Sequence, residues 1–289
     1  MATTINGPFG EARLVMSMST RDVIRAYRDK CGADVSKWFG QLTEIHMFEC
    51  QRTGYRFWRP SSVAGDEQFY RYLSEKWHDY YKEERWEYPL VREFLSSSDE
   101  LIEVGCGRGF FLKSIENHVT FAVGVELNTE AIADKVTRCD ILNSTIEQIA
   151  DEKPEAFSIV CSFQVLEHLV DPWSFLRACV KCLTPGGLLA IATPNYASST
   201  FRKRRDPFDL PPHHMGHFSA SVYERIAEMC QMILESIHVE SMTRQFSRSE
   251  ESPPLISRAG SQLLGGFRNL ARVLSRDSGH NILAIMRKR

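Results

Sequence analysis

Apolar runs that alternate with helix-like stretches in the middle of the chain predict a doubly wound α/β fold. The runs lie at residues 101–104, 121–126, 157–163 and 188–193. This alternation indicates βαβ crossovers and therefore a mostly parallel sheet. A last strand pair is expected at 233–240 and 281–286. In such a sheet the ligand lies at the carboxyl ends of the strands, near the topological switch point.

The N-terminal part has a different pattern. A helix is predicted at 18–30, and two short extended runs at 45–48 and 55–58 predict a small hairpin. We therefore expect three parts: a helix and hairpin module at 1–64, a core with a lid helix at 65–240, and a C-terminal piece with a loop, a basic amphipathic helix and the last strand at 241–289.

Apolar and aromatic residues recur at helical spacing between residues 65 and 95. Phe69, Leu73, Trp77 and Tyr81 follow one another at intervals of four. This spacing predicts a helix with a core-facing stripe.

Three alternating glycines follow the first apolar run. Gly105, Gly107 and Gly109 stand between a predicted strand and a predicted helix start. Glycine suits a sharp turn in which the backbone comes close to a nucleotide. A dinucleotide fingerprint counted from Gly105 would need a third glycine at position 110, which is Phe110 here. The spacing therefore disfavours a dinucleotide site.

The second predicted strand ends in a carboxylate, Glu126, which follows Gly109 by 17 residues. Folds of this type place an acid at a similar offset, where it binds the two ribose hydroxyls. A carboxylate would also repel a 2′-phosphate, which argues against NADP. A surface acid at a strand end is the alternative interpretation.

Composition narrows the protein class. The chain has 289 residues, 43% of them hydrophobic, which can supply a large core. A net charge of -2 argues against nucleic-acid binding. The eight cysteines are scattered and favour reduced thiols over a disulfide framework. We expect a cytoplasmic location, because neither a signal peptide nor a membrane-length apolar run is evident.

Three motifs together resemble class I methyltransferases that use S-adenosylmethionine (SAM). They are the Glu103-x-Gly-x-Gly-x-Gly turn, the segment at 163–172, and the Pro-Gly-Gly turn at 185–187. The last two resemble the ubiquinone-biosynthesis type, a group that includes sugar O-methyltransferases. The resemblance covers about residues 80–240 and implies a Rossmann-like seven-stranded sheet, SAM as the cofactor and S-adenosylhomocysteine as its product.

The resemblance also implies cofactor contacts. Glu103, the three glycines and Glu126 would hold the adenosine side, and Thr145 and Ile146 would contact the adenine. Gln164 would lie beside the sulfonium, and the pair Glu167 and His168 would be mainly structural. From the lid before the glycine turn, Tyr81 would cover the cofactor and Arg85 would bind the methionine carboxylate, which a guanidinium suits.

Relatives with this pattern often carry a zinc ribbon near the N-terminal hairpin. Only Cys31 and Cys50 remain near that place in this chain. Two thiolates do not complete a tetrahedral site, so we expect no zinc there.

The acceptor side is predicted in the segment at 209–218. His213 and His214 are the candidate catalytic bases, since an unperturbed histidine pKa of ~6.5 suits proton removal from a hydroxyl. A turn whose histidines only bond the backbone is the alternative. Magnesium prefers oxygen ligands and no carboxylate cluster is evident, so no metal is expected.

Two basic segments bear on partners. The run at 202–205 could bind a phosphate of a nucleotide- or lipid-linked sugar, or could simply be solvated. A basic apolar stripe at 258–276 could dock on the core, form a homodimer or rest on an anionic membrane. The preferred function is O-methylation of a sugar or glycan hydroxyl, as in polysaccharide biosynthesis. The alternatives are a quinone or phenol O-methyltransferase and a non-catalytic SAM-fold subunit.

Overall fold

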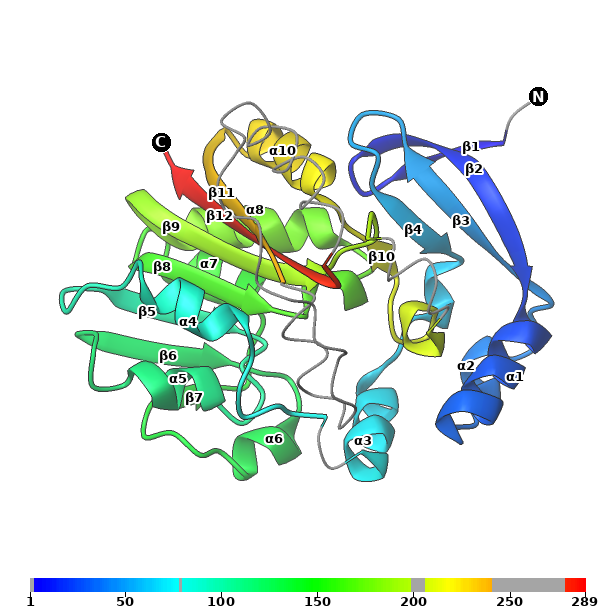
Figure 1. The fold of residues 1–289 in the computed structure, drawn as a ribbon, viewed down its shortest axis with the longest axis horizontal. Coiled ribbons are helices and arrows are strands. Elements are labelled where there is room, and N and C mark those ends of the chain that lie inside the picture. Colours follow the sequence, from blue (N-terminus) through cyan, green and yellow to red (C-terminus); the bar gives the residue numbers. More distant parts are fainter. Residues whose placement is uncertain (1–2, 78–79, 199–205, 241–278) are drawn as a thin grey trace, which may run out of the picture.

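The computed structural model describes residues 3–77, 80–198, 206–240 and 279–289, and its elements form two sheets side by side (Figure 1). The basic run at 202–205 and the predicted loop and helix after residue 240 lie outside the described residues. Within the described ranges no helix is long and apolar enough to cross a membrane.

The larger sheet has seven strands in the order β11-β12-β9-β8-β5-β6-β7. Neighbours from β9 to β7 pair in parallel, whereas β12 pairs antiparallel with both β9 and β11. The strands are β5 (Glu100–Val104), β6 (Phe121–Val125), β7 (Asp140–Leu142), β8 (Phe157–Phe163), β9 (Leu183–Pro194), β11 (Met232–Val239) and β12 (Asn281–Lys288). The predicted doubly wound, mostly parallel sheet is confirmed.

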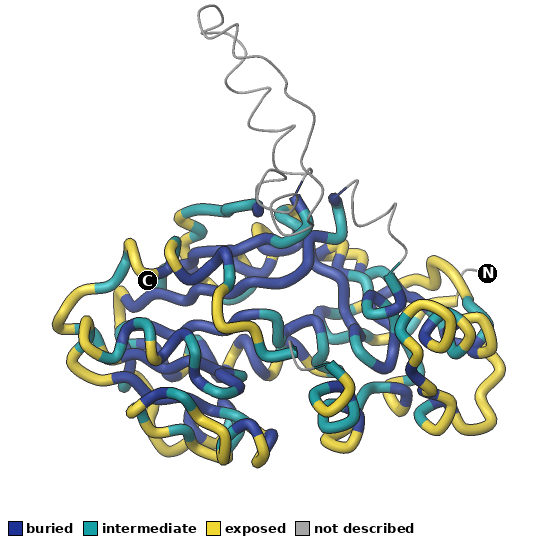
Figure 2. Tube along the Cα trace, turned by 60° about the horizontal axis from the view of Figure 1, so that its bottom comes forward, coloured by how far each residue is buried: buried dark blue, intermediate teal, exposed yellow. Residues whose placement is uncertain are grey.

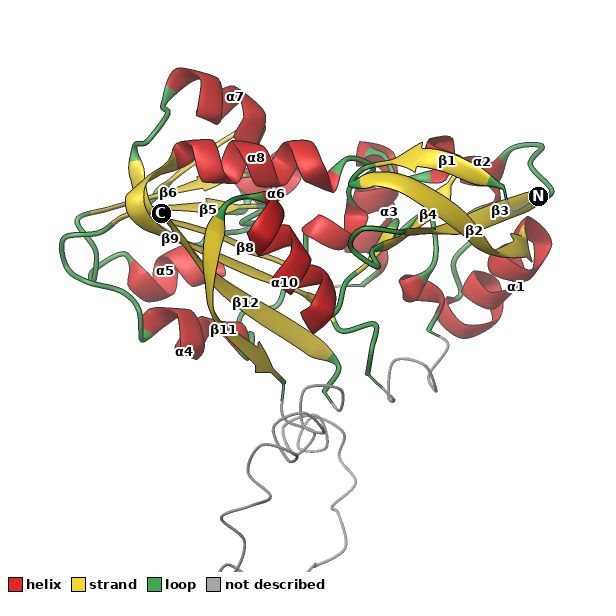
Figure 3. Ribbon diagram, turned by 90° about the horizontal axis from the view of Figure 1, so that it is seen from above, coloured by secondary structure: helices red, strands yellow, loops and turns green. Residues whose placement is uncertain are grey.

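Helices cover both faces of this sheet, and Figure 3 views the sheet between them. One face packs α7 (Ile146–Glu152), α8 (Pro172–Cys182) and α10 (Ala220–Met229). The other packs α4 (Glu87–Arg92) and α5 (Phe110–Ile115). Strand residues alternate between the two cores, so that Ile102 faces the first and Leu101 the second. A short helix, α6 (Thr129–Ala133), follows β6.

The smaller sheet has five antiparallel strands in the order β1-β2-β3-β4-β10. They are β1 (Thr4–Gly7), β2 (Gly10–Ser19), β3 (Glu44–Cys50), β4 (Arg56–Arg59) and β10 (Gly216–His217). Only the β3 and β4 hairpin was predicted. β2 carries three consecutive exposed apolar residues, 14–16, and a register shift, which hide the alternation expected of a strand.

The smaller sheet is joined to the larger one. β10 comes from the segment of the predicted bases and pairs with β4, and Phe9, Tyr55 and Phe57 belong to the same buried cluster as Ile102. Buried backbone runs through both sheets (Figure 2). The boundaries proposed at residues 64 and 240 remain a prediction.

The predicted N-terminal helix is α1 (Thr20–Cys31), which Gly32 ends in a left-handed conformation, and α2 (Ser36–Phe39) follows it. The prediction that one helical stripe runs from Phe69 to Tyr81 is wrong. α3 spans Glu67–Lys76, and Trp77 at its end has an extended backbone. Tyr81 therefore does not lie on the same helix as Phe69 and Leu73, which are fully buried.

Candidate active site

The glycine turn follows β5 at the carboxyl edge of the larger sheet. Gly105, Gly107 and Gly109 have φ angles of 73°, 55° and 80°, which L residues rarely adopt. A Cβ on Gly105 would lie 2.3 Å from Val165 Cγ2, and one on Gly107 would lie 2.6 Å from Tyr81 Cδ1. Both the backbone angle and the close packing therefore require glycine at these positions.

Glu126 lies directly against this turn. Its Oε2 accepts the amide of Gly107 at 2.8 Å, and its Oε1 accepts the amides of Leu127 at 2.9 Å and Asn128 at 2.8 Å. A carboxylate offers about four acceptor positions, so about one remains for a ligand. To accept both ribose hydroxyls, as the sequence predicts, the carboxylate must give up one backbone bond.

Tyr81 covers the middle glycine. Its hydroxyl accepts a hydrogen bond from Asn128 Nδ2 at 2.8 Å, while its ring packs on Gly107. Asn128 also caps α6 through its side chain. Sequence reasoning missed Asn128, although its type and its place before a helix are those of an N-cap. A nucleotide against Gly107 must pack on Tyr81 or displace it.

Three buried carboxylates lie near Arg85. Glu87, Glu103 and Glu167 are 1%, 3% and 1% exposed. Burial raises the pKa of each, that of Glu167 to about 8, and the nearby guanidinium partly opposes each shift. Each carboxylate has an oxygen without a hydrogen-bond partner among the described residues.

Gln164, which directly follows β8, connects this cluster to the predicted sulfonium position. Its Nε2 donates to Glu87 Oε1 at 3.0 Å, and its φ of 58° is unusual for a residue other than glycine. Three buried carboxyl groups lie near one guanidinium, and a ligand that carries positive charge would stabilise their ionised form. SAM carries a sulfonium and an ammonium group.

Thr145 and Ile146 have structural roles in this structure. The Thr145 hydroxyl accepts the amide of Gln148 and forms a capping box at the start of α7, and Ile146 is buried in the core. Their contact with an adenine remains a prediction.

The candidate bases belong to a compact histidine cluster, formed by His168, His213 and His214. The ring centroid of His213 lies 4.5 Å from those of both other rings, and His168 and His214 are 5.0 Å apart. His168 Nδ1 lies 2.8 Å from the carbonyl oxygen of His213. The structure thus adds His168 to the two predicted bases.

The expected pKa near 6.5 is wrong for these residues. Burial lowers the pKa of His213 and His214 well below the usual range and that of His168 to about 4. At neutral pH the rings are uncharged, so each has a nitrogen lone pair. They are weaker bases than an exposed histidine.

Adjacent tyrosines connect the cluster to the glycine turn. The ring centroid of Tyr80 lies 5.2 Å from that of Tyr81 and 6.2 Å from that of His213. The predicted donor and acceptor residues therefore lie on either side of one tyrosine pair.

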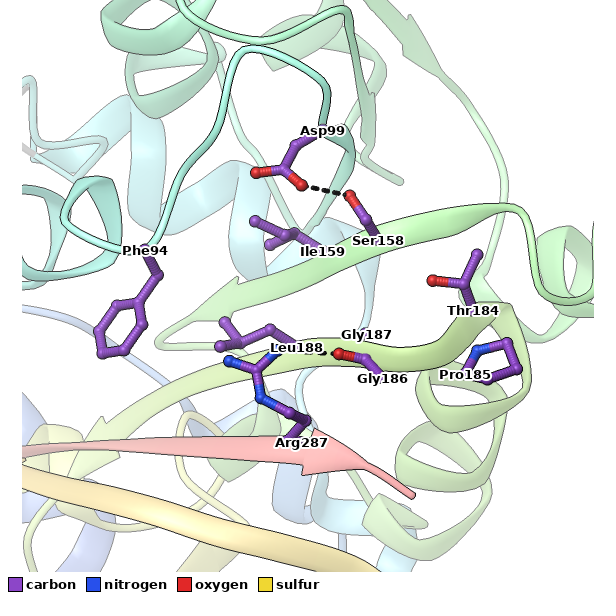
Figure 4. A pocket seen from close by; sticks show the side chains of 10 residues that line it. All are labelled: Phe94, Asp99, Ser158, Ile159, Thr184, Pro185, Gly186, Gly187, Leu188 and Arg287. Carbon is purple, nitrogen blue, oxygen red and sulfur yellow. Dashed lines mark hydrogen bonds between the residues drawn. The ribbon is translucent and has the colours of Figure 1, made fainter.

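A surface pocket of about 200 Å³ lies elsewhere (Figure 4). It is lined by Asp99 and Ser158, which precede and begin the neighbouring strands β5 and β8, and by the Pro-Gly-Gly turn at 185–187. Arg287 Nη1 donates to the carbonyl of Gly186 at 2.8 Å across it. This pocket lies at the amino ends of the strands, away from the glycine turn.

Comparison with curated proteins finds related enzymes. A ubiquinone biosynthesis O-methyltransferase of Aliivibrio fischeri is 32% identical over 103 residues, which cover 33% of this chain and 44% of that protein. The enzyme of the same name from Xanthomonas euvesicatoria is 32% identical over 127 residues, 39% of this chain and 52% of that protein. The matches span about half of these relatives' length.

Solved structures share the fold. A SAM-dependent methyltransferase from Archaeoglobus fulgidus aligns with a TM-score of 0.53 at 17% identity, over 76% of this chain and 100% of that one. One from Thermotoga maritima aligns with a TM-score of 0.50 at 16% identity, over 77% of this chain and 97% of that one. The family model described as a methyltransferase domain matches residues 73–231, which is more than half of the chain. The chain therefore belongs to the methyltransferase domain family.

Proposed function

We propose that this protein is a SAM-dependent methyltransferase that methylates a hydroxyl of a small aromatic acceptor, a phenol or a quinol. Family membership and the glycine turn with its carboxylate support the cofactor and the enzyme class. The relatives named as ubiquinone biosynthesis O-methyltransferases favour this acceptor class over the sugar expected from the sequence. Their names give no support to a role in polysaccharide biosynthesis.

One observation carries the acceptor class, namely the aromatic surroundings of His213. The rings of Phe69, Tyr70, Tyr80 and Phe208 lie 6.1, 6.2, 6.2 and 5.1 Å from its ring, centroid to centroid. A planar aromatic acceptor gains from offset or edge-to-face contacts with such rings. A sugar would need hydrogen-bonding groups that these side chains largely lack.

In this proposal the adenosine of SAM lies against the glycine turn, and Glu126 binds the ribose. Arg85 binds the methionine carboxylate, and the buried carboxylates favour the cationic groups of SAM. An imidazole of the histidine cluster, His213 or His214, takes the hydroxyl proton. The oxygen then forms a bond to the methyl carbon as the bond to sulfur breaks, which leaves S-adenosylhomocysteine. Alignment of the acceptor oxygen, the methyl carbon and the sulfur supplies most of the rate acceleration, because the sulfonium is already an activated donor.

Two measurements test the proposal. Calorimetry should detect binding of SAM and S-adenosylhomocysteine and no binding of NAD. Purified protein should then be incubated with SAM and matched panels of catechols, hydroquinones and sugars, with mass spectrometry to detect the gain of one methyl group. Methylation of sugars alone would contradict the acceptor class, and a failure to bind SAM would contradict the whole proposal.

A further inference from the structure

The histidine cluster has an arrangement that proton acceptance alone does not require. His168, His213 and His214 each offer a ring nitrogen, and the three nitrogens lie within 4.8 Å of one another. They come from two chain segments that meet only in the folded protein. We propose that these three imidazoles bind one divalent transition-metal ion.

The orientation of His213 supports a ligand role. Its Nδ1 lies 3.1 Å from the carbonyl oxygen of Phe208, to which it donates. The lone pair is therefore on Nε2, which is buried and has no hydrogen-bond partner in the part of the chain that the structure describes. An unpaired buried acceptor is unfavourable, because it has lost its hydrogen bonds to water. Histidines that bind metals typically donate their other N–H to a carbonyl in this way.

His168 has more hydrogen-bond acceptors around its ring than it has N–H groups to donate. Its Nδ1 and Nε2 lie 2.8 Å and 3.1 Å from the carbonyl oxygens of His213 and Gln164. A neutral imidazole has one N–H and can donate to only one of them. The other nitrogen then faces an oxygen with no proton between them, and a cation beside both atoms would remove this repulsion.

Acidic groups next to the cluster favour a cation. Glu167 Oε1 lies 4.0 Å from His168 Nε2, and neither Glu167 oxygen has a hydrogen-bond partner among the described residues. Asp209 Oδ1 lies 3.5 Å from His214 Nδ1, where it can orient that ring. A divalent ion beside them would stabilise the charged form of each carboxyl group, which the neutral imidazoles do not.

The ligand set selects the class of metal. Imidazole nitrogens suit zinc, cobalt, nickel, copper and iron, whereas magnesium and calcium prefer oxygen. Three protein ligands leave a coordination position open, as in catalytic sites. His168 lies 45 residues before His213 in the chain, so only the fold brings the three imidazoles together.

For its catalytic meaning the inference rests on the proposed function. A bound ion would hold the acceptor oxygen at the open position and favour its deprotonated form. The His213 lone pair would then serve as a ligand and not as the proton acceptor. Metal binding itself does not depend on the identity of the acceptor.

Cobalt titration tests the site directly. Full-length protein, stripped with a chelator and kept reduced, should develop visible absorption bands that saturate at one equivalent of Co²⁺ and disappear when Zn²⁺ is added. The bands should lack thiolate-to-cobalt charge transfer, which separates the site from the free cysteines. Absence of a saturable band would overturn the inference.

Variants locate the ion. His213→Asn keeps a donor toward the Phe208 carbonyl but removes Nε2, and we expect it to weaken Co²⁺ binding by at least the ~10–100-fold that loss of an outer-shell partner costs. The control is His118→Asn, which changes an exposed histidine away from the cluster and should bind Co²⁺ as the unmodified protein does. Equal affinity in both variants would contradict the assignment.

A measurement without substitutions covers the case in which His213→Asn does not fold. Zn²⁺ should raise the melting temperature of the stripped protein in a saturable way, because it binds the folded state. An unchanged melting temperature would contradict the site. SAM binding measured on the same stripped samples separates the two proposals. If SAM binds and Co²⁺ does not, only the metal inference fails; if Co²⁺ binds and SAM does not, the proposed function fails.

Discussion

The glycine turn and the histidine cluster lie on either side of the Tyr80 and Tyr81 pair, and they are built differently. The glycine turn is formed mainly by the main chain. Its glycines have left-handed conformations, and backbone amides donate to the Glu126 carboxylate. At the histidine cluster, side chains from two distant segments pack among aromatic rings.

Because of this difference, the glycine turn and the histidine cluster should tolerate amino-acid substitutions differently. A backbone-built site has few acceptable residues at each position, because the turn itself depends on them. A site built from packed side chains can change its shape by substitution while the backbone stays the same. We therefore expect conservative changes to affect cofactor affinity on one side and turnover on the other.

Substitution of the histidines should give the largest difference between the effect on turnover and the effect on SAM affinity. His213→Asn and His214→Asn should each lower turnover by ~10²–10⁴-fold, the usual contribution of a proton-transfer group, whether the imidazoles accept the proton or hold an ion that favours its release. Their affinity for SAM should change little, because neither side chain contacts the glycine turn. Single-turnover kinetics and calorimetry measure the two quantities. A matched loss of SAM affinity would show that the two halves are not separate.

Glu126→Ala should have the next largest effect, on the donor side. It removes the proposed ribose acceptor and three backbone hydrogen bonds, each charge-assisted bond contributing about 1.5–3 kcal/mol. We expect SAM affinity to fall by ~10²–10³-fold, as measured by calorimetry, with the fold retained by circular dichroism. Unchanged affinity would remove Glu126 from the cofactor site.

Gly107→Ala should have a smaller effect on the same side. The φ of 55° and the contact with Tyr81 make a Cβ unfavourable by about 1–2 kcal/mol, so SAM affinity should fall by ~5–30-fold. The matched control is Gly186→Ala, since Gly186 has a φ of 76° and a Cβ there would meet nothing within 4 Å. That control should lose stability without losing SAM affinity. Equal SAM affinity in the two variants would contradict the placement of Gly107 against the cofactor.

The smallest effect concerns acid stability. The His168 pKa of about 4 in the folded protein lies below its ~6.5 when unfolded, so the unfolded chain takes up the proton first. Its contribution is fully present above pH ~6.5 and is lost as the pH falls toward 4.

We therefore expect the melting temperature to fall more steeply over this range in the unmodified protein than in His168→Asn, by on the order of a few degrees. Glu167 acts in the opposite direction, because burial raises its pKa, but it is common to both proteins. Parallel melting curves against pH would contradict a buried neutral His168.

The fold was largely predictable because short apolar runs in the sequence mark most strands of the larger sheet. The run at 157–163 coincides with β8, and β5, β6, β11 and β12 begin or end within two residues of their predicted bounds. β2 could not be found in this way, since Leu14, Val15 and Met16 at its centre are exposed. The end of α3 could not be predicted either. Aromatic residues continue at intervals of four past Lys76, although the helical backbone ends there.

The candidate site was predictable in part, for the same reason. Glu126 lies against the turn because strand, turn and offset are encoded within a short stretch. His168 joins His213 and His214 only through tertiary packing, which a sequence without its fold does not display. Burial, and with it the lowered histidine pKa values, depends on the aromatic rings of other segments.

The two-residue strand β10 has a wider consequence. It pairs with β4, and the amide of Trp58 also donates to the carbonyl of Met215 at 2.9 Å, so the segment that bears His213 and His214 is fastened to the N-terminal sheet. Mutations in that sheet can therefore shift the proposed acceptor side while the glycine turn stays unchanged. Over evolutionary time, new acceptors can therefore be acquired by drift in the N-terminal sheet under an unchanged requirement for the cofactor.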